Sequence, residues 1–309
     1  MKSSIIVPVY NLEKYIGECI ESLLRQKGEI EIILVDNNST DGSRGIIEEY
    51  AKKDKRIKLI EEKKWGAAAA RNAGVKAATG KYLWFVDGDD WIEEGAIEKL
   101  ERTVRETGAE VVIVGFYKNF EDGRRFAQQP FNKQNWRKKI VWYGAGPWEF
   151  YVQRKWLVEQ GMWFPEGMMH EDIATTPTYG IKAGKVEIVE EGLYDYRQRK
   201  GSVLHQEKFN RHQLDIFRAL TIVEEKFREA GKYEEYREEI EFLYIWHLRS
   251  DAAKEFMRFR REPEAREGLR KIRKMMRKRF PKWRKNKYFK ERKMLEKVRF
   301  ITHYYGVGR

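Results

Sequence analysis

The chain has 309 residues, a length that can bury a substantial core in one large domain or in a domain with a helical appendage. Hydrophobic residues make up 41% of it, which argues against disorder, and no apolar run reaches the roughly 18 residues of a membrane-spanning helix. The net charge of +13 arises in residues 251–309, where 22 Lys and Arg face 7 Asp and Glu. The basic character therefore says little about chemistry in the rest of the chain.

Short β-branched runs alternate with helical patterns over the first 116 residues. This alternation predicts an α/β fold, with a mostly parallel, Rossmann-like sheet flanked by helices. The expected strands are Ser4–Val9, Glu31–Val35, Arg56–Ile60, Tyr82–Val86 and Val111–Phe116. The expected helices are Leu12–Gln26, Asp41–Lys53, Ala67–Ala78 and Glu93–Glu106. Crossovers of one hand bring the strand ends to a single sheet edge, where ligands of such folds bind.

The later residues predict fewer strands. Residues 117–135 are polar and suggest a hairpin or loop across the sheet, residues 147–160 suggest a helix, and Val186–Val189 suggests one more strand. After about Gln206 the pattern is almost wholly helical. We therefore predict one α/β domain over residues 1–205 and a basic helical C-terminal region over residues 206–309.

An acidic cluster, Asp87-Gly88-Asp89-Asp90, follows the apolar strand Tyr82–Val86. Carboxylates packed this closely repel each other unless a cation neutralises them. Mg²⁺ commonly binds one or two carboxylates together with substrate phosphates, and it would stabilise a diphosphate leaving group. The cluster thus suggests nucleotide-sugar chemistry. The alternative is an Asp-rich turn that caps the next helix.

Two earlier strands end in polar residues at the same predicted edge. In the first, Pro8 and Tyr10 precede a loop, and Tyr10 could stack on a ring. In the second, Asp36 could accept the imide N–H of a uracil. The alternative is that Ser39 and Asp41 of the second loop only cap the helix that follows.

A small-residue helix, Gly66–Gly74, carries Arg71 beside an asparagine. Small side chains let such a helix lie close to the sheet, and an arginine there can reach a phosphate or a base edge. The alternative is a solvated helix arginine.

These segments, in this order and spacing, resemble the family-two glycosyltransferases, which are inverting nucleotide-sugar enzymes of the GT-A fold. The N-terminal half of that family carries four sequence motifs in order. They are a Pro-Val-Tyr-Asn strand, a Val-Asp-Asp-Gly-Ser-Thr-Asp loop, an Ala-Arg-Asn-x-Gly helix and an Asp-x-Asp strand end. The match covers about residues 3–100 closely. One departure is visible, because Asn37 and Asn38 stand where the family often has Asp and Gly.

The resemblance implies roles for individual residues. The nucleoside pocket would be lined by Pro8, Tyr10, Asp36 and Arg71. Asp87 would lie near the ribose and beside the metal, Mg²⁺ or Mn²⁺, whose principal ligand would be Asp89. Asp90 would stabilise the loop or contact sugar hydroxyls.

A second acidic pair, Glu171-Asp172, follows a loop that contains Pro165 and Gly167. Inverting transfer needs a base near the acceptor hydroxyl. Family members with a Glu-Asp pair here use the aspartate in this way, which implies that Asp172 is the base and that Glu171 supports it or orients the acceptor. The alternative is an acid-decorated helix N-terminus.

The segment Tyr196–His205 is basic and contains a glycine. It suggests a loop that closes over a diphosphate, with Arg197 or Lys200 offsetting charge and Ser202 donating a hydrogen bond. His205 could complete the metal shell, although a lone histidine is more often a plain surface or packed residue. Trp148 offers an aromatic face to an acceptor sugar or, equally, packs in the core.

The basic tail mixes Lys and Arg with Met276, Phe280, Trp283 and other apolar residues. Such helices can lie on an anionic membrane, and solvated helix faces are the alternative. Nucleic acid is a weaker candidate partner, because no reading motif accompanies the charge. Cys19 is the only cysteine, and no signal peptide is recognisable, so we expect a cytoplasmic protein with a peripheral site on the inner membrane face as an option.

The sequence thus predicts transfer of a hexosyl or N-acetylhexosaminyl group from a UDP-sugar to a hydroxyl of a glycan or lipid-linked glycan, with inversion and a divalent metal, in cell-envelope polysaccharide synthesis. A sugar-phosphate nucleotidyltransferase is the nearest rival, but such enzymes usually carry a Gly-rich basic loop after the first strand, which Pro8-Val9-Tyr10 lacks. A non-enzymatic basic polyanion-binding protein is the rival from another class.

Overall fold

A computed structural model describes residues 1–128, 131–199 and 208–293. It divides into two compact units. The first comprises Met1–Asn135, Gly146–Glu171 and Lys182–Lys200, and the second comprises Trp136–Ala145, Asp172–Ile181 and Gly201–Arg309. The domain boundary predicted between residues 205 and 206 lies outside the described residues and stays a prediction.

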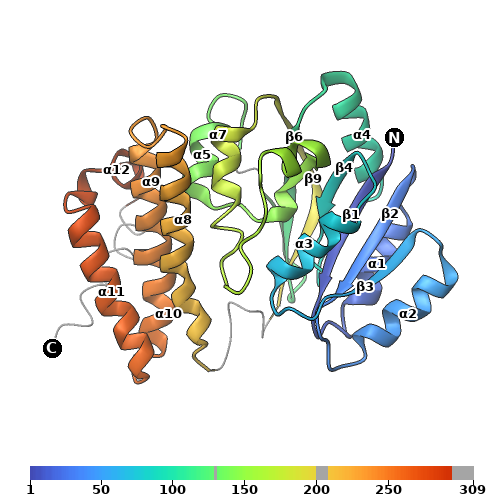
Figure 1. The fold of residues 1–309 in the computed structure, drawn as a ribbon, viewed down its shortest axis with the longest axis horizontal. Helices are drawn as coiled ribbons and strands as arrows, with labels where there is room; N and C mark the ends of the chain where they lie inside the picture. Colours follow the sequence, from blue (N-terminus) through green and yellow to red (C-terminus); the bar gives the residue numbers. More distant parts are fainter. Residues whose placement is uncertain (129–130, 200–207, 294–309) are drawn as a thin grey trace. The chain divides into compact units, whose positions relative to one another are not determined.

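The first unit is built on one mixed sheet (Figure 1). Its strands are β1 (Ser3–Val9), β2 (Ile30–Asp36), β3 (Ile57–Glu61), β4 (Tyr82–Phe85), β5 (Trp91–Ile92), β6 (Val111–Phe120), β7 (Arg125–Gln128), β8 (Phe150–Gln153) and β9 (Val186–Gln198). The order is β3-β2-β1-β4-β8-β6-β9-β5, and β7 pairs with β6 as a hairpin. The pairs β1–β2, β1–β4 and β2–β3 are parallel, which confirms the predicted fold class.

Strand β8 corrects the helix predicted over residues 147–160. Pro147–Glu149 forms a 3-10 turn and Arg154–Glu159 forms helix α6, but Phe150–Gln153 between them pairs antiparallel with both β4 and β6. Aromatic and β-branched residues favour a strand that is covered on both faces, and Phe150, Tyr151 and Val152 are all buried. A short apolar run of this kind has no periodicity that separates a buried strand from a buried helix.

Strand β9 is much longer than the predicted Val186–Val189. It runs on to Gln198, pairs parallel with β6 and antiparallel with β5, and passes an irregular register opposite Gly115 of β6. A Cβ on Gly115 would lie 2.7 Å from the backbone oxygen of Glu191, so a glycine is needed at this bulge. Tyr196 and Arg197 therefore belong to a strand and not to the predicted loop.

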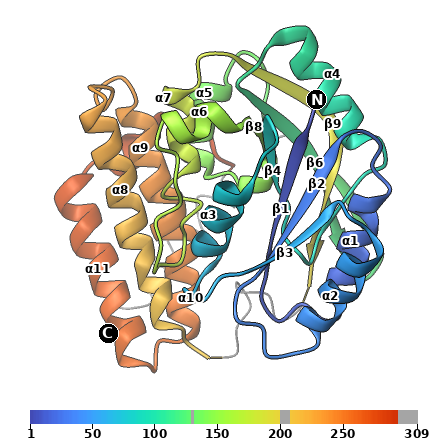
Figure 2. The same ribbon diagram turned by 45° about the vertical axis from the view of Figure 1, so that its right-hand side comes forward.

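Helices cover both faces of the sheet (Figure 2). In this unit they are α1 (Ile16–Leu24), α2 (Ser43–Lys53), α3 (Ala67–Ala77), α4 (Ala96–Thr107) and α6. Alternate residues of β1 point to opposite faces of the sheet. Ile5 packs in the same core as Cys19 of α1, whereas Ile6 faces α3. A Cβ on Gly74 would lie 2.3 Å from Cγ2 of Ile6, so the small residues of α3 do let it lie close to the sheet.

The second unit is helical in its described residues. Its helices are α5 (Trp136–Tyr143), α7 (Tyr179–Lys182), α8 (Ile216–Glu229), α9 (Arg237–Tyr244), α10 (Ala253–Arg258), α11 (Pro263–Arg279) and α12 (Lys287–Glu291), and Lys182 at the end of α7 belongs to the first unit. A π-helical segment, Ile245–Ala252, joins α9 to α10.

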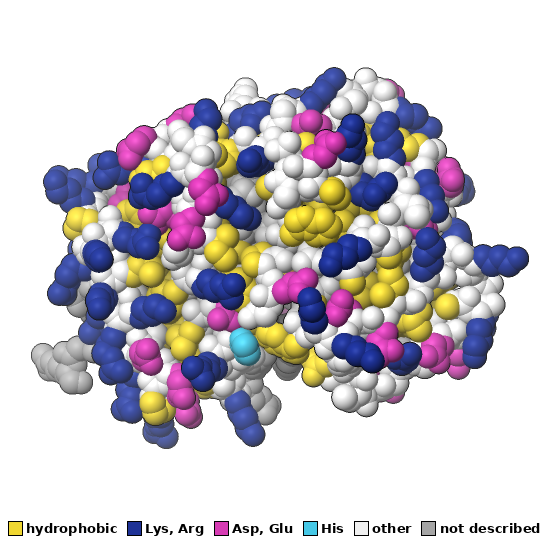
Figure 3. Space-filling model, viewed as in Figure 1, with side chains coloured by type: hydrophobic (Ala, Val, Ile, Leu, Met, Phe, Trp, Pro, Cys, Tyr) yellow, Lys and Arg dark blue, Asp and Glu magenta, His cyan; other side chains and the backbone are white. Residues whose placement is uncertain are grey.

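The apolar residues of the basic tail pack inward. Met276, Phe280, Trp283 and Phe289 are each at most 6% exposed, so the described part of the tail does not offer them to a membrane. Figure 3 shows Lys and Arg scattered over the visible surface instead of gathered in one patch. Among the described residues, no helix has both the length and the apolar character that crossing a membrane requires.

Candidate active site

The carboxyl ends of three parallel strands form one edge of the sheet. Val9 at the end of β1 is level with Asp36 at the end of β2, and the N–H of Val86, just past β4, donates to the carbonyl of Ile6. The sequence that follows each strand therefore emerges at the same edge. This edge collects the residues predicted to bind a nucleotide and a metal.

The loops after β1 and β2 are joined by side-chain hydrogen bonds. The Asn11 carboxamide oxygen accepts the N–H of Thr40 at 2.8 Å, and Ser43 accepts the N–H of Leu12 at 2.7 Å. Asn38 has a left-handed φ of 63°, a conformation that asparagine tolerates better than most residues. This explains how an asparagine can stand where the family often has glycine.

The predicted nucleoside residues differ in exposure. Tyr10 is 53% exposed, so its ring is available for stacking, and Pro8 is half-buried. Asp36 is 2% exposed, and its Oδ1 accepts the N–H of Ser39 at 3.2 Å. Arg44 lies 3.7 Å from its other oxygen. Base recognition by Asp36 and Tyr10 stays a prediction.

Arg71 bridges two carboxylates that are distant in sequence. Its Nη2 donates to Oδ1 of Asp87 at 2.9 Å, and its Nη1 donates to Oε1 of Glu171 at 2.6 Å. The guanidinium is 6% exposed. Desolvation raises the pKa of Asp87 above its ordinary value, while the charge of Arg71 opposes that rise. Arg71 is therefore held at the strand edge, beside the acidic turn.

Two arginines of the β9 end hold Asp89. The Nε of Arg199 donates to Oδ2 of Asp89 at 2.7 Å, and the Nε of Arg197 donates to the backbone carbonyl of Asp89 at 2.8 Å. Arg197 is also paired with Glu18 of α1. The carboxylate of Asp89 is 22% exposed, so it remains reachable from solvent.

Asp90 is buried, and its hydrogen bonds hold the backbone of the acidic turn in place. Its Oδ2 accepts the hydroxyl of Tyr194 at 2.6 Å and its Oδ1 accepts the N–H of Arg197 at 2.8 Å, which fixes the acidic turn against β9. The Tyr194 hydroxyl in turn accepts the N–H of Asp87 at 3.1 Å. Burial, and then the charges of Asp89 and Asp87, raise the pKa of Asp90 well above its ordinary value. These contacts suit the loop-stabilising role.

Arginines offset part of the charge of the acidic turn. A cation was expected as the neutralising group, and the structure supplies arginines, with Arg71 on Asp87 and Arg199 on Asp89. The pairing was not visible in the sequence because Asp89 and Arg199 are 110 residues apart.

The remaining predicted residues are distributed as follows. Glu171 lies in the first unit with Arg71, whereas Asp172 belongs to the second unit, where its Oδ1 accepts the N–H of Ile173 at 2.7 Å and its carbonyl accepts the N–H of Thr176. Ser202 and His205 lie outside the described residues, as does Lys200. Their roles stay predictions.

Trp148 is a core residue. It is 8% exposed and stacks on Tyr194 at 4.6 Å and Tyr196 at 5.3 Å, with Phe116 edge-on at 4.5 Å. It thus supports Tyr194, which the sequence interpretation missed. The alternation of aromatic and charged residues from Tyr194 to Arg197 is a strand signature that could have revealed both the longer β9 and this tyrosine.

Comparisons with known proteins agree with this arrangement. The sequence model of the family described as "Glycosyl transferase family 2" matches residues 4–162. The chain is 35% identical over 216 residues to the uncharacterized glycosyltransferase EpsJ of Bacillus subtilis (strain 168), which covers 65% of this chain and 62% of EpsJ. It is 35% identical over 220 residues to the glycosyltransferase GlyG of Streptococcus pneumoniae, which covers 66% of this chain and 73% of GlyG.

A third relative has been solved with a nucleotide. The poly(ribitol-phosphate) beta-N-acetylglucosaminyltransferase TarS of Staphylococcus aureus is 28% identical over 256 residues, which covers 79% of this chain and 44% of TarS. The crystal structure of TarS 1-349 in complex with UDP superposes with a TM-score of 0.65 at 25% identity, over 80% of this chain and 72% of that chain.

Proposed function

We propose that this chain, which belongs to glycosyl transferase family 2, transfers a hexosyl or N-acetylhexosaminyl group from a UDP-sugar to an acceptor hydroxyl, with inversion. The observation that carries the proposal is the convergence of Asp36, Arg71 and Asp89 at one sheet edge. The solved complex of its relative TarS with UDP supports the choice of nucleotide. Predicted motif residues from separate segments of the chain would thus bind the same nucleotide-sugar donor.

On the donor side, Tyr10 would stack on the uracil and Asp36 would accept its imide N–H. Arg71, held by Asp87 and Glu171 at the sheet edge, would line the nucleoside pocket. Arg197, held by the carbonyl of Asp89, would offset diphosphate charge, with Ser202 as a further predicted contact.

The acidic turn fits a divalent metal in the way Mg²⁺ usually binds. Within the described ranges, no set of three or more His, Cys, Asp or Glu side chains forms a metal centre, so Asp89 and Asp87 would share the ion with donor phosphates, and His205 stays a prediction. Mg²⁺ or Mn²⁺ bound there would supply positive charge for the leaving diphosphate. Asp89 suits this role because its carboxylate is partly exposed.

On the acceptor side, Asp172 would take the proton of the attacking hydroxyl. The acceptor oxygen then forms the new bond to the anomeric carbon as the bond to the diphosphate breaks, and UDP leaves with the electron pair. Glu171 would hold Arg71 in place and orient the acceptor. The acceptor would be the predicted glycan or lipid-linked glycan, and the name of TarS, a poly(ribitol-phosphate) beta-N-acetylglucosaminyltransferase, supports a polyol-phosphate polymer as a further candidate.

The test is UDP-sugar hydrolysis and transfer by the purified chain, with UDP binding measured by calorimetry with and without Mn²⁺. We expect Asp89→Asn to lose at least about a hundredfold in turnover. The matched control is Asp54→Asn, at the far end of α2. Full activity in Asp89→Asn, or no UDP binding by the wild type, would refute the proposal.

The two rivals predict other products. A sugar-phosphate nucleotidyltransferase would release pyrophosphate from UTP and a sugar 1-phosphate. A polyanion-binding protein would bind heparin with a salt dependence that is the same for the wild type and for the double variant Asp89→Asn/Asp172→Asn. Its heparin affinity would not change when UDP is added.

A further inference from the structure

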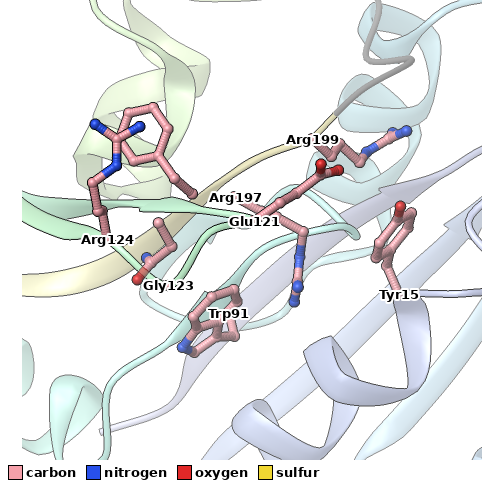
Figure 4. A pocket seen from close by; sticks show the side chains of 9 residues that line it. Tyr15, Trp91, Glu121, Gly123, Arg124, Arg197 and Arg199 are labelled. Atoms are coloured by element: carbon pink, nitrogen blue, oxygen red, sulfur yellow. The ribbon is translucent and has the colours of Figure 1, made fainter.

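A cavity of about 260 Å³ opens in the first unit beside the acidic turn (Figure 4). It lies among the start of α1, strand β5, the β6–β7 hairpin and the end of β9. Its wall combines three aromatic side chains, Tyr15, Trp91 and Phe120, with three arginines, Arg124, Arg197 and Arg199. Asn119, Gly123 and one carboxylate, that of Glu121, complete the wall, so the arginines leave a net positive charge of two. The described lining does not include Tyr10, Asp36 or Arg71, so it differs from the predicted nucleoside pocket.

Each arginine of the wall lies beside an aromatic ring. The guanidinium of Arg197 is 4.6 Å from the ring centre of Trp91, that of Arg199 is 4.9 Å from Tyr15, and that of Arg124 is 5.1 Å from Phe120. Cation–π attraction of this kind favours such positions. The cavity therefore offers apolar ring faces and charged N–H donors side by side.

The hairpin wall is anchored by an ion pair between the partly exposed Arg125 and the buried Asp195. Arg125, next to Arg124, donates from Nε and Nη2 to Oδ1 of Asp195 at 3.0 and 2.8 Å, and Asn119 donates to the same oxygen at 2.8 Å. Asp195 is fully buried. Since breaking such a pair leaves an uncompensated charge, the hairpin holds Arg124 and Phe120 against the cavity.

The cavity shares a border with the acidic turn. Arg197 and Arg199 line it and also hydrogen-bond Asp89. Two molecules that react must be held next to each other in a defined geometry. A ligand of this cavity would thus be separated from the predicted donor only by the arginines that contact Asp89.

Resting on the function proposed above, we infer that this cavity is an acceptor subsite for one phosphate-bearing sugar or polyol unit. The rings of Phe120 and Trp91 would cover the carbon skeleton, and Arg124 would bind the phosphate together with Arg199 once the donor complex releases Arg199 from Asp89. The volume fits a single unit, because pockets for larger organic ligands measure about 300–1,000 Å³. Arg124 pairs with the exposed Asp122, Arg197 with Glu18 and Arg199 with Asp89, so a phosphate would exchange with carboxylates of this wall.

The experiment compares ribitol 5-phosphate with neutral ribitol, each titrated into the full chain by calorimetry or ligand-observed NMR. We expect ribitol 5-phosphate to bind at least about tenfold more tightly than ribitol, and Arg124→Gln and Phe120→Ala each to weaken it about tenfold. Arg102→Gln, an exposed arginine of α4, is the matched control and should change nothing. UDP affinity should be the same in all four proteins, which also shows that the variants are folded.

Three results would overturn the subsite. They are equal binding of ribitol and ribitol 5-phosphate, unchanged binding in both cavity variants, and loss of UDP affinity in both folded variants, which would assign the cavity to the donor. Ribitol 5-phosphate binding that depends on Arg124 in a protein that binds no UDP would refute the donor function and leave the subsite supported.

Discussion

Arg199 donates a 2.7 Å hydrogen bond from its Nε to Oδ2 of Asp89, and so places an arginine where the predicted metal would bind. The partners are 18% and 22% exposed, which leaves the pair close enough to solvent to exchange. A metal that binds Asp89 must therefore compete with a resident cation.

We predict that Arg199→Gln raises the affinity of the nucleotide-free protein for Mn²⁺. A partly exposed ion pair is worth up to about 1 kcal/mol, so the gain should be roughly threefold to fivefold. Free Mn²⁺ can be followed by electron paramagnetic resonance. Unchanged affinity would show that Arg199 does not compete, and Arg102→Gln controls for the loss of one positive charge.

Arg71→Met should destabilise the protein by about 2–4 kcal/mol, because it leaves Asp87 and Glu171 without their shared cation in a largely buried setting. Adding Glu171→Gln should recover part of that loss. The free energies of unfolding from urea titrations of both single variants and the double variant form a thermodynamic cycle. Simple additivity across the cycle would contradict the direct coupling.

Tyr194→Phe should cost about 1–3 kcal/mol, since Asp90 loses a hydroxyl donor and the N–H of Asp87 loses an acceptor in a fully buried place. Tyr10→Phe is the control, because that side chain is 53% exposed and should change stability by less than about 0.5 kcal/mol. Chemical unfolding measures both. Equal stability of the two variants would mean that the Asp90 contact contributes nothing.

Glu149 should make stability fall as pH rises. Burial raises the pKa of its carboxyl to about 8, so the folded chain holds a proton that the unfolded chain loses near pH 4.5. A group with a raised folded pKa stabilises most at pH below the unfolded value, and the contribution declines until pH passes about 8. The decline is at most on the order of 5 kcal/mol.

Melting temperatures between pH 5 and pH 8 should therefore fall less steeply for Glu149→Gln than for the wild type. Glu190→Gln, an exposed acid of β9, provides the comparison. Identical slopes for the wild type and Glu149→Gln would show that Glu149 does not titrate in this range.

The N-terminal half of the fold could be predicted because each of its elements is encoded locally. Runs such as Ile30–Asp36 are β-branched, end at a polar loop and are followed by a helical pattern, so β1 to β4 were found to within a few residues. Up to α4, the largest shift is at the start of α1, which begins at Ile16 and not at Leu12, because the backbone turns at Asn11 with a left-handed φ of 52°.

The contacts of the acidic turn could not be predicted because they depend on a strand that the sequence interpretation ended too early. Tyr194 and Arg199 reach Asp90 and Asp89 only if β9 continues past Gly192. Two exposed glutamates and a glycine interrupt the apolar run just before that point. Pairing with β6 outweighs this interruption, and the alternation from Tyr194 to Arg197 is the local signal of the strand that remains.

Strand β9 carries Tyr194 and Arg197, and Arg199 follows directly after its last residue, Gln198; all three contact the acidic turn. Side chains of a strand alternate between faces, so inserting or deleting one residue after Gly192 would turn every later side chain to the opposite face. The hydrogen bonds to the acidic turn and the wall of the neighbouring cavity would then be lost together. Among homologues, length changes should therefore gather at the β6–β7 turn and be excluded from this stretch.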